Sequence, residues 1–291
     1  MKTRLPQFRL PILALTLFLA ACQKDAVLPT PASPVMPVAA LPEHLTLGNP
    51  SGATTDPTQP TNYLLLKPQY ALSYHRDRGT PNWVSWHQSA DWRGSAARQD
   101  DFRADATLPA GWYQVQASSY TNSGFDRGHL CPSADRTSTV ADNSATFLMT
   151  NMTPQAPRLN QQTWANLEDY CRNQLATGNE VYIIAGSYGR GGTGSNGYLT
   201  TLDQGRVAVP ARCWKVVVVL PTGADDAARV SPSTRIIAVD MPNDNAISTS
   251  WGTYRTTVDA IEAATGYDIL SAVPASVQQV VEARVDNGPT S

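Results

Sequence analysis

The 291-residue sequence has little net charge and few cysteines. Its 22 Lys and Arg residues face 24 Asp and Glu, so it lacks the basic surplus with which non-specific nucleic-acid binders displace counterions. None of its four cysteines forms a C-x-x-C pair, which argues against a structural zinc site. Apolar residues still make up 42% of the chain, enough for a core, so global disorder is excluded.

The N-terminus has the pattern of an export signal. A basic start, Met1–Arg4, precedes a mostly apolar run, Leu10–Ala21, that is too short to span a bilayer. Leu19–Cys22 resembles the lipobox of bacterial lipoproteins, in which cleavage precedes the cysteine and its thiol is lipidated. An ordinary signal peptide with an incidental cysteine is the alternative. We therefore predict a signal peptide over residues 1–21 and an exported protein, lipid-anchored to the cell envelope through Cys22 and facing the periplasm or the cell surface.

The remaining chain divides by composition and periodicity. Residues 22–60 are rich in Pro and Ala and predict an extended tether, followed by a folded domain over 61–275 and a C-terminal helix and tail over 276–291. Strands and helices do not alternate regularly, which predicts an α+β domain with a largely antiparallel central sheet flanked by helices. The expected strands are Tyr63–Leu66, Gln69–His75, Trp83–His87, Val181–Ala185, Arg206–Val209, Trp214–Leu220 and Arg235–Val239, and the expected helices are Asn160–Thr177, Thr256–Thr265 and Ser276–Val285.

The densest chemistry lies in the tetrapeptide Asp126–His129. A histidine is the usual general base near neutral pH, and Gly128 would allow a tight backbone and a close approach of substrate. Asp126 could orient the imidazole, although a structural hydrogen bond or a simple solvated turn would explain the same residues. The other histidines, at positions 44, 75 and 87, have no such neighbours and are expected to be structural or exposed.

A second polar group follows at helical spacing. Its members are Asn160, Trp164, Glu168 and Arg172. Steps of four residues advance about 40° each around an α-helix, so all four would lie within about 120° of one face. Taken singly, Asn160 could be a helix N-cap, and Glu168 with Arg172 a surface pair contributing a few tenths of a kcal/mol.

Together, these segments resemble the DNA/RNA non-specific endonuclease family, the ββα-metal nucleases that include Serratia-type nucleases and mitochondrial endonuclease G. The resemblance spans roughly residues 63–274 and would make residues 61–275 the nuclease domain. Its main motifs are Gly124–Leu130, Thr146–Gln155, Leu159–Gln161 and Trp164–Glu168, with weaker similarity at Val207–Pro210, Trp214–Val216, Met241–Asn243 and Ile261–Gly266. It implies the ββα-metal nuclease fold and a metal-dependent phosphodiester hydrolase.

The resemblance also implies roles for matching residues. His129 would be the general base that activates water, and Asn151 would support the site. Asn160 would be the single protein ligand of a Mg²⁺ ion, with Mn²⁺ as a substitute, and Glu168 would hold waters bound to that ion. Arg172 would face the phosphate.

Three parts of this transfer are less direct. The segment around His129 would be supported by its neighbours Asp126, Arg127 and Gly128, although Arg127 has no firm chemical role. The upstream arginine of the family matches Arg98 best, with Arg103 as the competitor. Cys131 departs from the small residue that often follows the leucine, and any of the cysteines at 131, 171 and 213 could pair.

The expected reaction is hydrolysis of DNA and RNA with little sequence preference, because nothing in these motifs reads base edges. Two alternatives remain at this stage. A formal charge of −5 after loss of residues 1–21, with 19 basic and 24 acidic residues, would suit a non-catalytic nucleic-acid-binding lipoprotein on the same scaffold. A periplasmic phosphodiesterase or nucleotidase acting on small substrates is the other. Retention of His129, Asn160, Glu168 and Arg172 together argues against a non-catalytic scaffold.

Overall fold

The computed structural model describes Met1 and residues 42–290. The predicted signal peptide beyond Met1, Cys22 and the first part of the predicted tether lie outside the described residues. No helix within the described part combines the length and the apolar character needed to cross a membrane.

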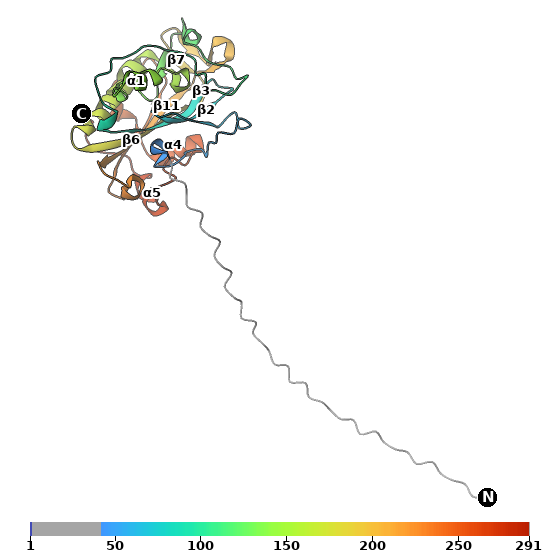
Figure 1. The fold of residues 1–291 in the computed structure, drawn as a ribbon, viewed down its shortest axis with the longest axis vertical. Helices are drawn as coiled ribbons and strands as arrows, with labels where there is room; N and C mark the ends of the chain where they lie inside the picture. Colours follow the sequence, from blue (N-terminus) through green and yellow to red (C-terminus); the bar gives the residue numbers. More distant parts are fainter. Residues whose placement is uncertain (2–41, 291) are drawn as a thin grey trace. The chain divides into compact units, whose positions relative to one another are not determined.

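A seven-stranded sheet forms the centre of the domain, and every neighbouring pair of strands in it is antiparallel. In spatial order the strands are β1 (Tyr63–Leu66), β2 (Ala71–His75), β3 (Thr80–Gln88), β6 (Asn179–Tyr188), β11 (Arg212–Pro221), β12 (Arg235–Pro242) and β13 (Arg255–Thr256). The longest, β6 and β11, pair over their whole length in the middle of the molecule (Figure 1). The predicted α+β class with a largely antiparallel sheet is confirmed.

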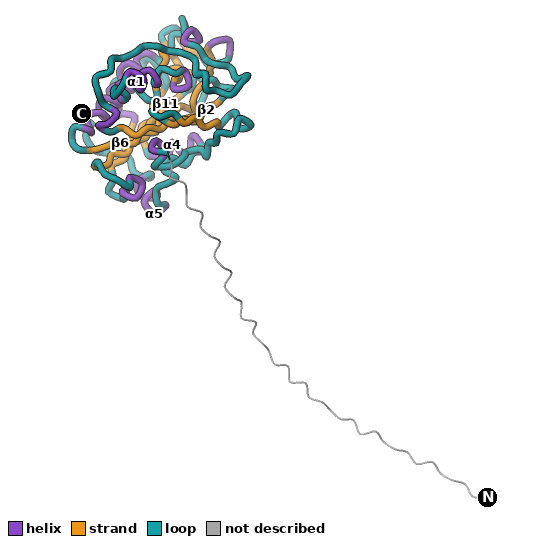
Figure 2. The backbone as a smooth tube through the Cα atoms, viewed as in Figure 1, coloured by secondary structure: helices purple, strands orange, loops and turns teal. Residues whose placement is uncertain are grey.

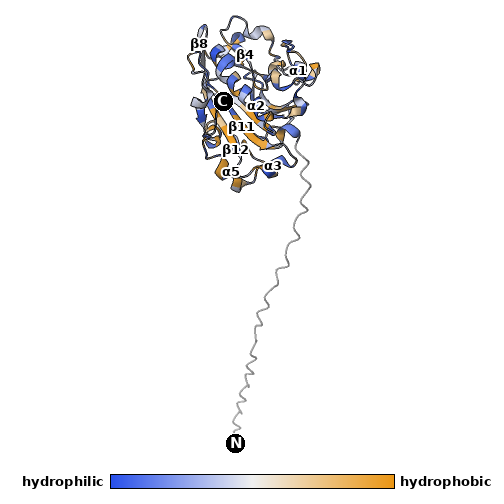
Figure 3. Ribbon diagram, turned by 90° about the vertical axis from the view of Figure 1, so that its left-hand side faces the viewer, coloured by the Kyte–Doolittle hydropathy of each residue, from blue (hydrophilic) through white to orange (hydrophobic). Residues whose placement is uncertain are grey.

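Successive side chains of each strand point to opposite faces of the sheet, and both faces are apolar. Val217 of β11 points into one core, and its neighbours Val216 and Val218 point into the other. The first face is covered by α2 (Ala165–Leu175), and the second by α4 (Val258–Thr265) and α5 (Ala275–Val281). Figure 3 shows β11 and β12 as the hydrophobic centre of this arrangement.

Shorter elements surround the sheet (Figure 2). Three two-stranded ribbons pair β4 (Asp126–His129) with β5 (Met152–Gln155), β7 (Gly192–Gly194) with β8 (Gly197–Leu199), and β9 (Thr201–Leu202) with β10 (Val207–Ala208). The remaining α-helices are α1 (Val140–Ala145) and α3 (Asp226–Arg229). A π-helix spans Leu159–Trp164, and 3-10 turns lie at Glu43–Leu45, Ala90–Trp92, Ala117–Tyr120, Ser133–Asp135, Met149–Asn151, Asp203–Gly205 and Trp251–Tyr254.

The folded domain begins earlier than the sequence predicted. Within the predicted tether, Leu45 and Leu47 are buried in the second core, and Ser51 accepts a 2.8 Å hydrogen bond from Trp83. Residues 42–60 are therefore part of the domain, because their few apolar side chains find partners on the sheet that composition does not reveal.

The C-terminal segment is also joined to the domain. Val281 is fully buried, and Asp286 pairs with Arg235 at 2.8 Å and with Arg255 at 3.3 Å. The predicted helix over Ser276–Val285 is confirmed in type but ends at Val281. Gly266 ends α4 in the left-handed conformation at φ 77°, which is typical of a glycine at the C-terminal cap of a helix.

Candidate active site

Two short strands and a helix form one unit beside the sheet. β4 pairs with β5 so that His129 lies opposite Met152 and Asp126 opposite Gln155. The chain then enters the π-helix and continues into α2. Asp126–His129 is thus an extended strand and not a solvated turn.

Gly128 has a different reason for being glycine from the one predicted. It lies in the extended strand, and a Cβ built there would be 2.2 Å from Oε1 of Gln155. The Gln155 side chain is fully buried against this position. The missing side chain therefore makes room for the neighbouring strand, and does not serve a tight turn or the approach of a substrate.

Asp126 ties β4 to the start of the helix. Its Oδ2 accepts 2.8 Å and 2.9 Å hydrogen bonds from the side-chain amides of Asn160 and Gln161. The carboxylate thus orients the helix, and no hydrogen bond links it to His129. Asn160 lies inside the π-helix and is not an N-cap. Because its NH₂ group faces Asp126, its carbonyl oxygen is left as an acceptor.

Asp126 and Asn160 line a cleft of about 520 Å³. Its other walls include two arginines and two aromatic residues: Arg98, Arg127, Phe102 and Tyr120. We call this the β4 cleft. Arg103, the competitor of Arg98, is not among its lining residues and donates instead to Ser144 O at 2.9 Å and to Asp101 at 2.7 Å.

His129 lies beside the β4 cleft and packs against two phenylalanine rings that also contact each other. Its ring centroid is 5.5 Å from that of Phe102 and 4.9 Å from that of Phe147. The Nε2 atom is buried and has no hydrogen-bond partner. Burial, together with the charges of Arg98 and Arg127, lowers the pKa of His129 to about 3. The imidazole is therefore neutral, the form that can accept a proton, across the physiological range.

Glu168 and Arg172 belong to a buried ionic cluster and do not line the β4 cleft. Their side chains are 12% and 14% exposed, which rules out a surface pair. Oε1 of Glu168 lies 3.6 Å from Nζ of the fully buried Lys215, and Arg172 pairs with Asp135 at 2.9 Å. Burial raises the pKa of Glu168 to about 7, although Lys215 and Arg172 oppose the shift.

The π-helix separates Asn160 at the β4 cleft from Glu168 and Arg172 in the ionic cluster. The predicted single α-helix over Asn160–Thr177 is wrong in its first turn, because the wider π turn changes the angle between successive side chains. Trp164 faces the core, with Nζ of Lys215 4.1 Å from its ring centroid. Asn160 consequently reaches the β4 cleft, whereas Glu168 reaches the ionic cluster.

Asn151 supports the segment that follows His129. Its side chain accepts a 3.0 Å bond from the Cys131 amide and donates at 2.8 Å to the carbonyls of Cys131 and Thr146. It is fully buried and therefore fixes the backbone without reaching the cleft. Cys131, Cys171 and Cys213 are all buried and unpaired.

Several residues were not singled out from the sequence. Gln161 and Lys215 lie inside the resembling motifs, so the motifs were the available signal, although no spacing rule assigned them a partner. Phe102 and Tyr120 come from loops and turns outside these motifs. Only the folded chain brings their rings to the β4 cleft.

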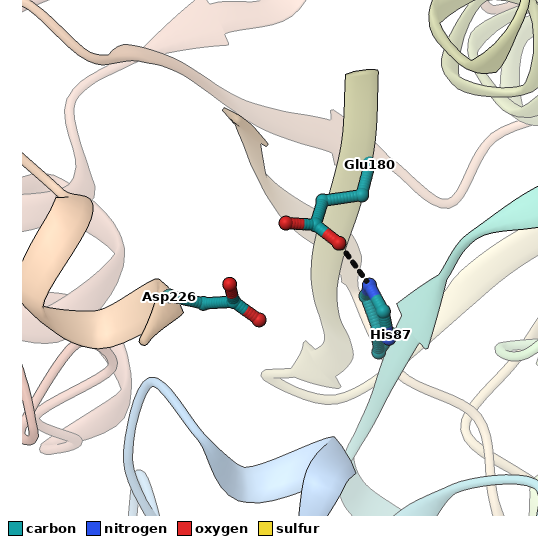
Figure 4. Close-up of side chains that lie close together, drawn as sticks. All are labelled: His87, Glu180 and Asp226. Carbon is teal, nitrogen blue, oxygen red and sulfur yellow. Dashed lines mark hydrogen bonds and ion pairs between the residues drawn. The ribbon is translucent and has the colours of Figure 1, made fainter. Parts of the chain in front are cut away.

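A second group of metal-binding residue types lies elsewhere. His87, Glu180 and Asp226 have potential ligand atoms within 4.8 Å of one another, and His87 Nε2 lies 3.1 Å from Glu180 (Figure 4). Nη2 of Arg229 contacts both carboxylates. A bound ion would have to displace this guanidinium, which already compensates their charge.

Comparison with known proteins finds nucleases that match most of the chain. A model of the family described as DNA/RNA non-specific endonuclease matches residues 47–276. A nuclease of Nostoc sp. is 51% identical over 244 residues, covering 84% of this chain and 86% of that protein. Human mitochondrial endonuclease G is 30% identical over 209 residues, covering 70% of this chain and 68% of that protein.

The fold has its own match in a crystal structure of an EndoG/EndoGI complex. The two chains superpose with a TM-score of 0.63 at 23% identity, over 79% of this chain and 91% of that one. At this identity the match supports the fold alone. The sequence relatives and the family model carry the further conclusion that the chain belongs to the DNA/RNA non-specific endonuclease family, and that it is a non-specific endonuclease.

Proposed function

We propose that the protein hydrolyses phosphodiester bonds in both DNA and RNA at the β4 cleft, with His129 as the general base and Mg²⁺ as the metal. One observation carries this proposal: Asp126 holds Asn160 against β4, so that an amide oxygen and two arginines share one cleft next to a neutral histidine.

The two arginines suit a phosphodiester. Arg98 and Arg127 both line the cleft, and guanidinium groups donate to phosphate oxygens in a fixed geometry. Their charges also depress the pKa of His129. A bound phosphate offsets these charges, so the imidazole becomes a stronger base when substrate is present. Proton transfer from water to His129 is thereby coupled to phosphate binding.

The donor set fits a hard cation. The free carbonyl oxygen of Asn160 and the carboxylate of Asp126 are oxygen ligands of the kind that Mg²⁺ and Mn²⁺ accept. When bound, the ion supplies positive charge that stabilises the transition state of phosphodiester cleavage. We assign Asn160 as the ligand, Glu168 as a group that acts through water, and Arg172 as a further cation near the phosphate.

Substrate breadth follows from what lines the cleft. The donors that the cleft offers to a nucleic acid are chiefly guanidinium groups, which bind phosphate regardless of base or sugar. We therefore expect DNA and RNA to be cut with little sequence preference.

Export through a lipid anchor at Cys22 is a further part of the proposal. It rests on the basic start, the short apolar run and the Leu19–Cys22 motif. Labelling with a radioactive or alkyne-bearing fatty acid in a bacterial host tests it. Incorporation that disappears in Cys22→Ala supports the anchor, and equal labelling of both proteins contradicts it.

Cleavage assays test the catalytic proposal. Plasmid DNA and a structured RNA are incubated with protein in Mg²⁺, in Mn²⁺ and in chelator, and both are expected to be cut only when metal is present. A protein that shifts DNA in a gel but never cuts it would be a non-catalytic binder. Hydrolysis restricted to small phosphodiesters would indicate the nucleotidase alternative.

A further inference from the structure

Three acidic side chains meet on the face of the sheet opposite α2. Asp259 and Glu262 lie in the first turns of α4, and Glu282 caps the C-terminal end of α5. Their potential ligand oxygens all lie within 4.8 Å of one another. The Asp259 amide also donates to the Glu282 carbonyl at 3.2 Å, which fixes the two helix ends together. We call these residues the acidic triad.

Glu282 is the unusual member. It is only 6% exposed, and its Oε1 atom is buried without any hydrogen-bond partner. Leaving a buried polar atom unpaired destabilises the folded state, and more so when the group is charged. No hydrogen-bond partner among residues 42–290 therefore accounts for this buried oxygen atom.

No neighbouring basic side chain compensates the triad within residues 42–290. Arg284, two residues from Glu282, donates to the carbonyls of Pro232 and Thr234. Arg235 and Arg255 are committed to Asp286. The charged groups near Glu282 are acidic instead. Burial, together with the charges of Glu262, Asp259 and Asp268, raises the pKa of Glu282 to about 7.

We propose that the acidic triad binds one Ca²⁺ ion that joins α4 to the C-terminal segment. Carboxylate oxygens are the ligands that Ca²⁺ prefers, and three carboxylates with added water can supply the six to eight oxygens it takes. Mg²⁺ demands a stricter octahedron and gives up its water reluctantly. Asp259 is exposed, so the ion has a path from solvent.

The site is structural and separate from the β4 cleft. α4 and α5 pack on the second core, whereas the helix that follows β5 packs on the first. Binding should therefore change stability and leave cleavage unaltered. With only three protein residues we expect an affinity on the order of 10⁻⁴–10⁻³ M, the range of extracellular calcium modules.

Thermal unfolding of the full chain tests the proposal. After treatment with chelator, addition of 10 mM CaCl₂ should raise Tm by roughly 5 °C, and the same concentration of MgCl₂ by less. Glu282→Gln should lose the Ca²⁺ response. In chelator this variant should be at least as stable as the wild type, because one uncompensated charge has been removed. Asp91→Asn, which removes an exposed acid outside the triad, should respond to Ca²⁺ like the wild type.

Two further variants separate the triad from the cleft. Asp259→Asn changes the exposed member and should weaken the response even if Glu282→Gln folds poorly. Asp126→Asn should keep the full response, and Glu282→Gln should cut plasmid DNA at the wild-type rate in Mg²⁺. Absence of a Ca²⁺ response in the wild type overturns the proposal. So does a response that survives Glu282→Gln and Asp259→Asn but disappears in Asp126→Asn.

Discussion

At the scale of single residues, the proposal assigns the role of general base to His129. His129→Ala should reduce plasmid cleavage by about 10²–10⁴-fold, because the base is lost. The substitution removes aromatic contacts with Phe102 and Phe147 but breaks no hydrogen bond of the buried Nε2 atom, so the fold should change little. Cleavage rates and thermal unfolding should be measured together.

His75→Ala is the matched control for this change. His75 also presents a half-buried ring with a buried nitrogen that lacks a partner, but it lies in β2, outside the β4 cleft. It should retain near wild-type cleavage. Normal cutting by His129→Ala, or equal losses in both variants, would remove His129 from the role of base.

Lys215 sets the ionisation of Glu168. Burial raises the pKa of Glu168, and the lysine opposes that shift from 3.6 Å. Lys215→Met should therefore raise this pKa further, by roughly one unit. If cleavage needs the carboxylate, the rising limb of the pH–rate profile moves to higher pH, and the loss of activity is greatest below pH 7.

Lys67→Met serves as the comparison for Lys215→Met. It breaks another buried lysine–carboxylate pair, with Asp105 at 2.8 Å, outside the ionic cluster. Its pH–rate profile should keep the wild-type midpoint even if stability falls. An unchanged profile in Lys215→Met would show that the ionisation of Glu168 does not limit the reaction.

At the scale of elements, the pairing of β4 with β5 depends on Gly128. Gly128→Ala places a methyl group against the buried Gln155 side chain and should cost about 1–3 kcal/mol, with loss of cleavage. The double variant Gly128→Ala/Gln155→Ala keeps the added methyl group but removes the Gln155 side-chain atoms that it would meet. It should recover much of the free energy of unfolding measured with denaturant. A double variant no more stable than Gly128→Ala would refute this packing explanation.

Elements with a strong local sequence pattern could be predicted, whereas elements that depend on distant partners could not. Six of the seven strands of the central sheet were found because β-branched runs such as Val216–Val219 carry a strong local signal, and α2 because Leu167, Cys171 and Leu175 repeat at helical spacing. The two-residue β13 was missed, and Thr256 was assigned to the following helix. β4 has no such signal, since Asp, Gly and Arg are poor strand formers and its partner lies more than twenty residues away. The π turn is invisible to a pattern that assumes 3.6 residues per turn.

The site was predictable to the extent that its motifs are local. The motifs supplied His129 and Asn160, the family resemblance suggested Arg98 as the upstream arginine, and all three lie at or beside the β4 cleft. The link between Asp126 and Asn160 joins residues 34 positions apart, so only the folded chain reveals it. The same holds for Glu168, whose partner Lys215 comes from a different core strand.

At the scale of the whole molecule, two truncated proteins test where the folded domain begins. Removal of residues 1–41 should leave thermal stability and cleavage unchanged. Removal of residues 1–60 should destabilise the protein strongly, because it exposes the core covered by Leu45 and Leu47 and deletes the Ser51 partner of Trp83. Equal stability of the two truncated proteins would show that residues 42–60 belong to the tether and do not contribute to the folded domain.

The central claim is that the β4 cleft is the active site and that Asn160 carries its metal ligand. Asn160→Ala and Gln161→Ala test it most directly, because each removes one amide hydrogen bond to the same oxygen of Asp126, at 2.8 and 2.9 Å, whereas only Asn160 lines the cleft. The measurement is the rate of plasmid cleavage across a Mg²⁺ titration. We predict that Asn160→Ala loses cleavage at every Mg²⁺ concentration while Gln161→Ala retains most of it. Equal rates for the two variants would contradict the account.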